Sequence, residues 1–390
     1  MGNFCTNCGA KLNENGNFCP KCGHPVNGSP PGGGSENVVD KLTRQINQMA
    51  GGKGAVKLRV RDLFTDIFKK HSLEEANQIF ISGTHSTTSA EHEISASWPK
   101  PWLYSRVFLM FAVTFIMLQI CANTFDNILA LAGMMFVGAL MVPFACLMLF
   151  QEVNAPRNIS FFEIVQMFFV GGVASLVFTL LLFEIFPGST ESYVEAVIVG
   201  IVEELGKLAI VAYYIYKKPN IKYMLNGLLI GAAIGAGFAT FETAGYIFRG
   251  FFEGYRLTMS IPAAYDYMLD ITYLRAILAP GGHVAWAAIN GAAIMLVKKN
   301  KKFETNMLLN GQFLKFFLIT VALHAIWDMP IMFSKDRSSF FDRIFLIQDL
   351  LVIIAWMIIL VLIQVGLNQI SNNVFGAQAE TQAEPQQTDA

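Results

Sequence analysis

Seven ionisable residues of this chain lie within apolar stretches that are long enough to cross a membrane. One stretch holds two acids and a lysine, the next an acid, the third a histidine, and the fourth a histidine with an acid: Glu203, Glu204, Lys207, Glu242, His283, His324 and Asp328. A charge at the bilayer centre costs about 3 kcal/mol on insertion scales, so such residues are rare unless they function. Carboxylates and imidazoles gathered in this way can hydrolyse a bond, bind a metal or relay ions.

Sequence spacing divides this set. Glu203 and Glu204 lie four and three residues before Lys207, so all three can meet along one helix face. One acid is expected to pair with the lysine, which leaves the other for chemistry. His324 and Asp328 are also four residues apart. They can address one metal, or Asp328 can orient the imidazole.

Single members of the set also have structural interpretations. An isolated intramembrane histidine is more often a hydrogen-bonded packing residue than a ligand, and one glutamate can staple two helices. Arg275, near a helix end, is expected to extend to the membrane interface. Pro280, Gly281 and Gly282 precede His283 and are expected to break or kink its helix. The set as a whole favours a site, because the apolar segments around these four spans carry no charge.

The composition is that of a polytopic membrane protein. Of its 390 residues 15% are charged and 54% hydrophobic, whereas soluble proteins have about 25% charged residues. A crossing needs about 20 apolar residues, and runs of that length occur at 107–125, 127–151, 164–183, 194–216, 223–248, 272–297, 314–333 and 350–368. The predicted fold class is all-α with about eight transmembrane helices, and no nucleic-acid partner is expected.

Lysine and arginine residues set the expected orientation. They are twice as frequent in the loops of one side as in those of the other, which favours both termini in the cytoplasm. With helices that alternate in direction and rise 1.5 Å per residue, the polar residues of four spans fall in one layer, ~8–16 Å below the outer surface. The sequence therefore predicts that these residues meet.

Four of the six cysteines form two CxxC pairs near the N-terminus. Residues 3–12 and 17–26 repeat the pattern Asn-Phe-Cys-x-x-Cys-Gly, with the pairs Cys5/Cys8 and Cys19/Cys22. Four such thiolates suit one tetrahedral Zn²⁺, and a disulfide pair or a redox motif is the alternative. The module resembles the small β-type zinc ribbons at the N-termini of many prokaryotic membrane proteins. That resemblance implies a structural zinc, a prokaryotic plasma membrane, and a surface that could recruit a protein partner.

The other segments complete the predicted domain organisation. After the ribbon (1–26), residues 27–35 form a flexible Gly/Pro/Ser linker, and residues 36–97 a small cytoplasmic or juxtamembrane region. Its basic stretch could rest on anionic headgroups or be the solvated face of a small soluble domain, which is the preferred interpretation. Ser72 and Glu75 form a predicted capping box there. The transmembrane domain covers 98–370, and the polar tail 371–390 is expected to be disordered.

Four motifs resemble those of the PrsW family of intramembrane proteases, which is part of a larger group with the CAAX prenyl endopeptidases and bacteriocin-immunity membrane proteins. They are EELGK at 203–207, FATFE at 238–242, the segment around His283, and HAIWD at 324–328. Their order on successive spans is specific, although each alone is weak. The resemblance covers residues 100–368 and leaves out the ribbon and residues 36–97.

This resemblance implies hydrolysis of peptide bonds in membrane-associated protein substrates, with metal-activated water. One acid of the EELGK motif would be the general base, and the lysine would hold the other ionised: Glu203, Glu204 and Lys207. His283 and His324 would bind Zn²⁺ or another divalent metal. The two remaining acids would be further ligands or would orient the ligands: Glu242 and Asp328. The prenyl endopeptidases have His in place of the first and commonly Asn in place of the second, which leaves the ligand set open.

Three other interpretations stay open. The chain contains no HExxH, so a metal-free glutamate-based mechanism is one of them. A transporter or channel could use the same residues as a proton or cation relay; it predicts ion flux in liposomes. A scaffold that recruits partners through the ribbon predicts normal function after the buried acids are neutralised.

Overall fold

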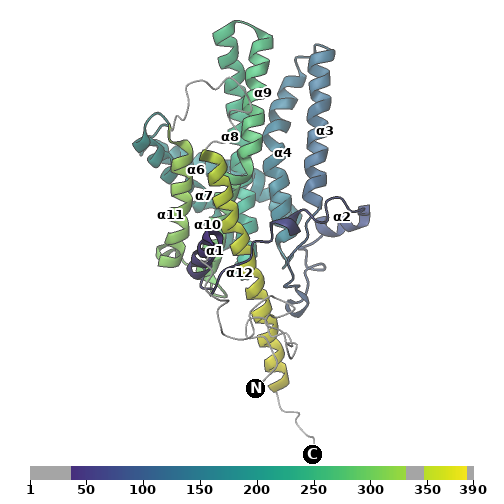
Figure 1. Cartoon of the computed structure of the whole chain (residues 1–390), viewed down its shortest axis with the longest axis vertical. Helices are drawn as coiled ribbons and strands as arrows, with labels where there is room; N and C mark the ends of the chain where they lie inside the picture. Colours follow the sequence, from purple (N-terminus) through teal and green to yellow (C-terminus); the bar gives the residue numbers. More distant parts are fainter. Residues whose placement is uncertain (1–36, 331–346, 384–390) are drawn as a thin grey trace, which may run out of the picture.

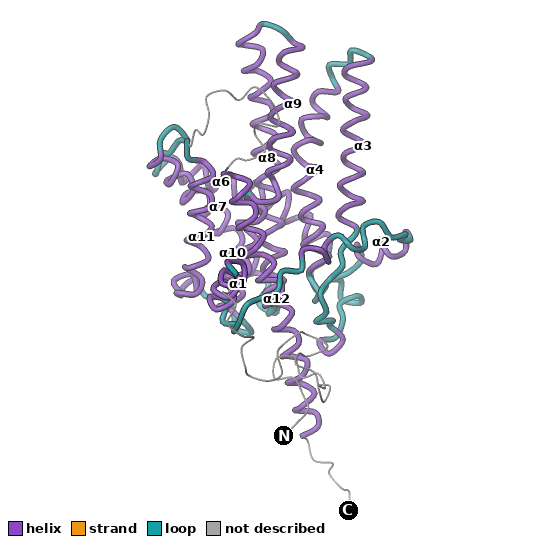
Figure 2. The backbone as a smooth tube through the Cα atoms, in the orientation of Figure 1, coloured by secondary structure: helices purple, strands orange, loops and turns teal. Residues whose placement is uncertain are grey.

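The computed structural model describes residues 37–330 and 347–383. Within them every regular element is helical (Figure 2). The four ribbon cysteines and the 27–35 linker lie outside the described residues. The predicted all-helical membrane fold is confirmed for the residues that the structure describes.

Eight helical stretches correspond to the predicted crossings (Figure 1). Six have the length and apolarity of a membrane span, and two are more polar because they carry site residues. In chain order they are α3 (Leu103–Thr124), α4 (Ala130–Val153), α5 (Phe161–Gln166) continued through the π-turn η3 (Met167–Gly171) into α6 (Gly172–Phe183), α7 (Tyr193–Lys217), α8 (Met224–Thr258), α9 (Ile261–Leu278) with α10 (His283–Lys298), α11 (Gly311–Asp328) and α12 (Ile347–Ala383).

Residues 249–271, which connect the predicted crossings 223–248 and 272–297, are helical except at the turn of Met259 and Ser260. The charged residues of this stretch lower its hydropathy, yet Arg256 and Glu253 pair on the helix surface at 2.6 Å. On the other side of this helix pair, Ile247 of α8 and Met268 of α9 are buried in one apolar cluster. The stretch thus forms the end of α8 and most of α9.

The predicted break before His283 is confirmed. Residues Ala279–Gly281 form a 3₁₀ turn (η4), and α10 begins at His283 itself. A side chain at Gly281 would overlap Val352, since its Cβ would lie 2.4 Å from that residue. The turn therefore packs directly on α12, and His283 is fixed at the start of a helix.

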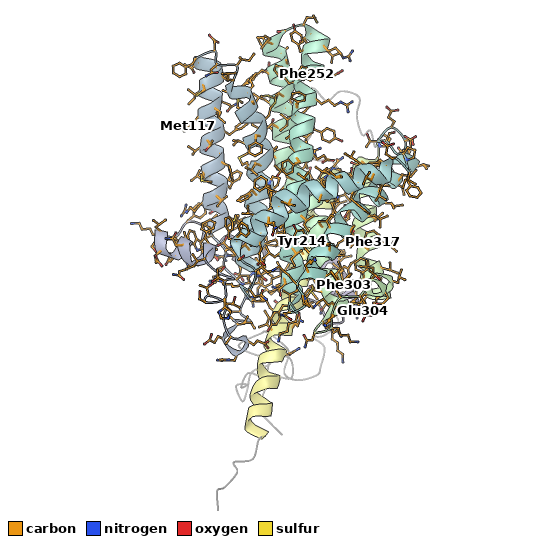
Figure 3. All side chains as sticks on the ribbon, turned by 180° about the vertical axis from the view of Figure 1, so that it is seen from behind. Met117, Tyr214, Phe252, Phe303, Glu304 and Phe317 are labelled. Carbon is orange, nitrogen blue, oxygen red and sulfur yellow. The ribbon has the colours of Figure 1, made fainter. Side chains whose placement is uncertain are left out.

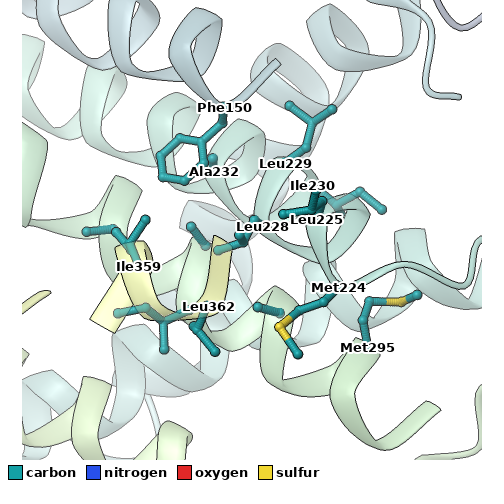
Figure 4. Packing of buried hydrophobic residues seen from close by; sticks show 14 of the residues in the cluster. Phe150, Met224, Leu225, Leu228, Leu229, Ile230, Ala232, Met295, Ile359 and Leu362 are labelled. Carbon is teal, nitrogen blue, oxygen red and sulfur yellow. The ribbon is translucent and has the colours of Figure 1, made fainter. Parts of the chain in front are cut away.

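Helices α8 and α10 pack backbone to backbone at the centre of the molecule. A Cβ on Gly231 would lie only 2.0 Å from the carbonyl oxygen of Ala287, which is the close approach that small residues allow between membrane helices. Apolar side chains from α8, α10 and α12 surround this contact; Figure 4 shows Met224, Leu228, Met295 and Ile359 among them. This core holds the helices that carry the polar residues.

A second group of helices, α3, α4, α9 and the end of α8, extends from that core (Figure 1). Figure 3 shows Met117 on α3 and Phe252 on α8 at the far end of this group, and they are 61% and 53% exposed. The first turn of α3 is tied to α4, because the Glu152 carboxylate accepts the backbone N–H groups of Trp102, Leu103 and Tyr104 at 2.8–2.9 Å.

Two short helices, α1 (Val38–Met49) and α2 (Leu73–Phe80), precede the membrane helices, with the 3₁₀ turns η1 (Val60–Leu63) and η2 (Glu91–Glu93). The predicted capping box of Ser72 and Glu75 is present at α2. At the other end, α12 continues as a helix through residues 371–383, which differs from the disordered tail predicted there. Another 3₁₀ turn, η5 (Thr305–Leu309), connects α10 to α11.

Candidate active site

The seven predicted residues come together between α7, α8, α10 and α11. Glu204, Lys207 and His324 are at most 2% exposed, and Glu203 is 8% exposed. Ion-pair contacts of 2.7–3.9 Å connect all seven into one cluster: Glu203, Glu204, Lys207, Glu242, His283, His324 and Asp328.

Glu204 is the acid whose oxygens are both occupied. Its Oε1 accepts hydrogen bonds from Lys207 Nζ at 2.7 Å and from His324 Nδ1 at 2.9 Å. Its Oε2 accepts the Asn290 amide at 3.0 Å. Thr320 donates to the Asn290 Oδ1 at 3.0 Å and so fixes the orientation of that amide. This fully bonded carboxylate links three helices, α7, α10 and α11.

Glu203 differs from its neighbour in having an oxygen without a partner. Its Oε2 is buried and accepts no hydrogen bond within the described part of the chain. The nearest nitrogens are His324 Nε2 at 3.5 Å, Lys207 Nζ at 3.8 Å and His283 Nδ1 at 3.9 Å. A buried unpaired carboxylate oxygen is costly, so this position suits a ligand or reactant.

The imidazole of His324 is held by one nitrogen and open at the other. Glu204 accepts from Nδ1, which leaves Nε2 facing Asp328 Oδ2 at 3.3 Å and Glu203 at 3.5 Å. The ring stacks on Trp286 with centroids 4.4 Å apart. Both interpretations of Asp328 given by the spacing are compatible with this geometry.

The imidazole of His283 has a partner at each nitrogen. Nδ1 lies 2.8 Å from Lys207 Nζ, and Nε2 lies 2.9 Å from Glu242 Oε2. Because an ammonium group can only donate, Nδ1 is the acceptor and Nε2 carries the hydrogen that Glu242 accepts. Phe238 packs against the ring at 4.9 Å.

Arg275 belongs to the site, so the prediction that it extends to the membrane interface is wrong. Its guanidinium donates to Glu242 Oε2 at 2.6 Å and to Thr243 Oγ1 at 2.8 Å, and it lies 4.3 Å from the Tyr246 ring centroid. The physical reason is that Arg275 lies on α9, which packs against α8 and so brings the guanidinium to Glu242. An intramembrane arginine beside a polar set was the signal that could have identified it.

A cavity of about 230 Å³ opens against this cluster. Helices α7 to α12 all contribute to its wall, which includes Glu203, Glu242, Arg275, His324 and Asp328. Glu204 and Lys207 lie behind that wall. The cavity therefore presents Glu203, whose Oε2 has no hydrogen bond, and the fully hydrogen-bonded Glu204 supports the wall from outside.

The donor atoms of Glu203, His283 and His324 lie within 4.8 Å of one another, close enough to hold one metal ion. The unpartnered Glu203 oxygen and the open Nε2 of His324 fit such an ion. A carboxylate on the far nitrogen of a histidine is the usual support of a metal ligand, and Glu204 supplies it to His324. His283 would have to release Lys207 or Glu242 to coordinate.

Asn290 and Thr320 were missed by sequence reasoning. Both are uncharged and sit in apolar helices, where such residues are frequent. The only available signal was their position, one on α10 and one on α11, at the spans that also carry His283 and His324.

Comparison with known proteins agrees with this geometry. A family model described as PrsW family intramembrane metalloprotease matches residues 127–363, and a zinc-ribbon domain model matches residues 4–26. The chain is 28% identical over 177 residues to Protease PrsW of Clostridioides difficile (strain 630), an overlap of 44% of this chain and 67% of that relative. No solved structure matches. These findings support a peptidase over the transporter and scaffold interpretations.

Proposed function

The chain belongs to the PrsW family of intramembrane metalloproteases, and we propose that Glu203 is the general base with which it hydrolyses membrane proteins. The observation that carries this proposal is the difference between two adjacent acids. Glu204 has both oxygens hydrogen-bonded, whereas Glu203 Oε2 is buried, unpartnered and at the cavity wall.

In the proposed reaction Glu203 takes a proton from water as the water oxygen bonds to the scissile carbonyl carbon. The same carboxyl then gives that proton to the amide nitrogen as the carbon–nitrogen bond breaks. Proton transfer of this kind contributes about 10²–10⁴-fold to rate. Glu204 and Lys207 do not react. They hold His324 and His283 in place through the contacts at 2.7–2.9 Å.

A divalent metal, with Zn²⁺ as the expected ion, would be held by His324 and Asp328, and by His283 through the Nδ1 that Lys207 would then release. When bound it would lower the pKa of water toward ~7 and polarise the carbonyl. Glu242, fixed by Arg275, keeps the hydrogen of His283 on Nε2. The residues therefore supply both a fixed ligand set and a mobile proton acceptor.

Glu203→Gln and Glu204→Gln test this division. Membranes containing each variant or the wild type are compared for new protein N-termini by mass spectrometry. Glu203→Gln should abolish them while leaving thermal stability unchanged, whereas Glu204→Gln should also lower stability. Glu195→Gln, on the same helix and outside the cluster, is the matched control. Full cleavage by Glu203→Gln would refute the proposal.

Metal content is tested separately. Replacing the ribbon cysteines with serine removes that site, so metal retained per chain reports on the membrane site alone. We expect about one metal ion per chain in this cysteine variant, and we expect that ion to be lost when His283→Ala and His324→Ala are added together. Retention of the ion in that double variant would contradict the assigned ligands.

We further propose that the ribbon, 1–26, binds one structural zinc through Cys5, Cys8, Cys19 and Cys22 and can recruit a protein partner. The 27–35 linker would join it to the region 36–97 and to the membrane domain 98–370. Both termini would lie in the cytoplasm of a prokaryotic cell, in line with the lysine and arginine bias. Protease digestion of sealed inside-out vesicles tests the orientation, since it should remove the ribbon.

A further inference from the structure

The segment between α1 and α2 exposes apolar and basic side chains together. Val60, Phe64 and Phe68 are 48%, 51% and 91% exposed. Phe68 is the most exposed large apolar side chain in the described part of the chain. Because apolar surface is driven out of water, such a group of exposed side chains marks an interaction site.

This segment is held against the first turns of α3. The Arg106 guanidinium donates to the backbone carbonyl of Lys69 at 3.1 Å, and the Tyr104 hydroxyl donates to that of Leu63 at 2.9 Å. After Arg106, α3 continues as an uncharged run, and only 11% of its most apolar window is buried. The segment therefore lies at the level where a lipid-facing helix enters the membrane.

The charges of this segment are predominantly positive. Lys57, Arg61 and Lys70 are exposed and have no ion pair among the described residues. Asp66 is engaged by Lys69 at 2.8 Å, and this hydrogen bond lowers the pKa of the Asp66 carboxyl below its usual value. Asp66 thus offsets Lys69, while the other three cations remain available to an anionic surface.

We propose that residues 57–70 form an interfacial anchor, whose aromatic side chains insert among the headgroups of the membrane that α3 crosses and whose unpaired cations bind anionic phospholipids. Phenylalanine occurs on the inserted face of interfacial membrane segments, and each lysine or arginine near an anionic surface adds attraction. The occupant is the membrane because the anchor is continuous with the lipid-facing surface of α3. The basic stretch then belongs to the membrane surface rather than to a free soluble domain.

The full-length protein in lipid nanodiscs tests this anchor. Hydrogen exchange of peptides covering 57–70 is compared in discs of phosphatidylcholine and in discs with an equal share of phosphatidylglycerol. A phospholipid with a photoreactive acyl chain is added to map contacts by mass spectrometry. We expect lipid adducts on these peptides, and exchange several-fold slower in the anionic discs.

Two sets of variants separate the contributions. Phe64→Ser with Phe68→Ser should remove the lipid adducts, and neither change disturbs a buried contact. Lys57→Gln, Arg61→Gln and Lys70→Gln should remove the difference between the two kinds of disc. The control, with the same loss of charge, changes three lysines of the α10–η5 loop to glutamine: Lys299, Lys301 and Lys302. Absence of adducts on these peptides, or exchange that is independent of the lipid, would overturn the proposal.

Discussion

The bundle that carries the site and the helices that extend from it differ in where their charged residues lie. In α8 the most apolar window is 94% buried, and in α3 only 11% is buried. Buried charges such as Glu204 and Lys207 lie in the first region, while the charges of the second, such as Arg256 and Glu253, pair at the surface. Helix faces that are covered by other helices can hold a charge network, whereas charges on the uncovered faces of the outer helices pair at the surface.

Glycine substitutions on α8 give the largest expected difference between the two regions. Gly231→Ala should destabilise the protein by about 3 kcal/mol, because the added Cβ meets the α10 backbone. Gly245→Ala, on the lipid-facing end of the same helix, has open space and should stabilise it by about 1 kcal/mol. Denaturant titration in detergent measures both, and equal effects would contradict the comparison.

Removal of a buried amide comes next. Asn290→Ala deprives Glu204 of a donor and should cost about 1–3 kcal/mol, with a parallel loss of cleavage as His324 loses its support. Gln119→Ala removes an amide of the outer group, which donates to the Tyr273 hydroxyl at 3.2 Å. We expect the Gln119→Ala variant to have the same melting temperature as the wild type. If Asn290→Ala changed neither stability nor cleavage, the hydrogen-bonded carboxylate of Glu204 would not be what holds the bundle together.

Arg275→Gln should lower kcat/KM about 10–100-fold, with a small change in stability. The reason is that Glu242 loses a partner at 2.6 Å and no longer fixes His283. Arg275→Lys keeps the charge without the forked contact to Thr243 and should recover only part of the rate. Kinetics on a cleaved membrane substrate would measure kcat/KM for both variants. Full activity in Arg275→Gln would contradict the assignment of Arg275 to the site.

Arg256→Gln is the outer counterpart and should have the smallest effect. Arg256 pairs with Glu253 on an exposed helix surface, where screening by solvent leaves little net stabilisation. Melting temperature and cleavage rate should both match the wild type. A clear loss in either would mean that the outer group contributes to catalysis.

The sequence predicted the members of the site better than their roles. Charged residues are so costly in lipid that Glu203, Glu242 and His324 could be identified together, as members of one set. The division between Glu203 and Glu204 depends on Asn290, which lies 86 residues away in the chain. No local pattern predicts that pairing.

The outer part of the fold was harder to predict for the same reason. Hydropathy identified the apolar spans, but Arg249, Glu253 and Arg256 made a helix resemble a loop. With α9 missed, Arg275 was placed near a helix end and assigned to the interface. Its actual partner, Glu242, follows only from the three-dimensional arrangement of α8 and α9.

The break at residues 279–282 has an electrostatic consequence. Because α10 begins at His283, the positive end of its helix dipole, equivalent to roughly half a charge, lies at the wall of the cavity. Three carboxylates, of Glu203, Glu242 and Asp328, border the cavity at this point. An unbroken helix would carry that end to the surface. The interruption thus brings a positive potential that does not depend on pH to a group of buried carboxylates.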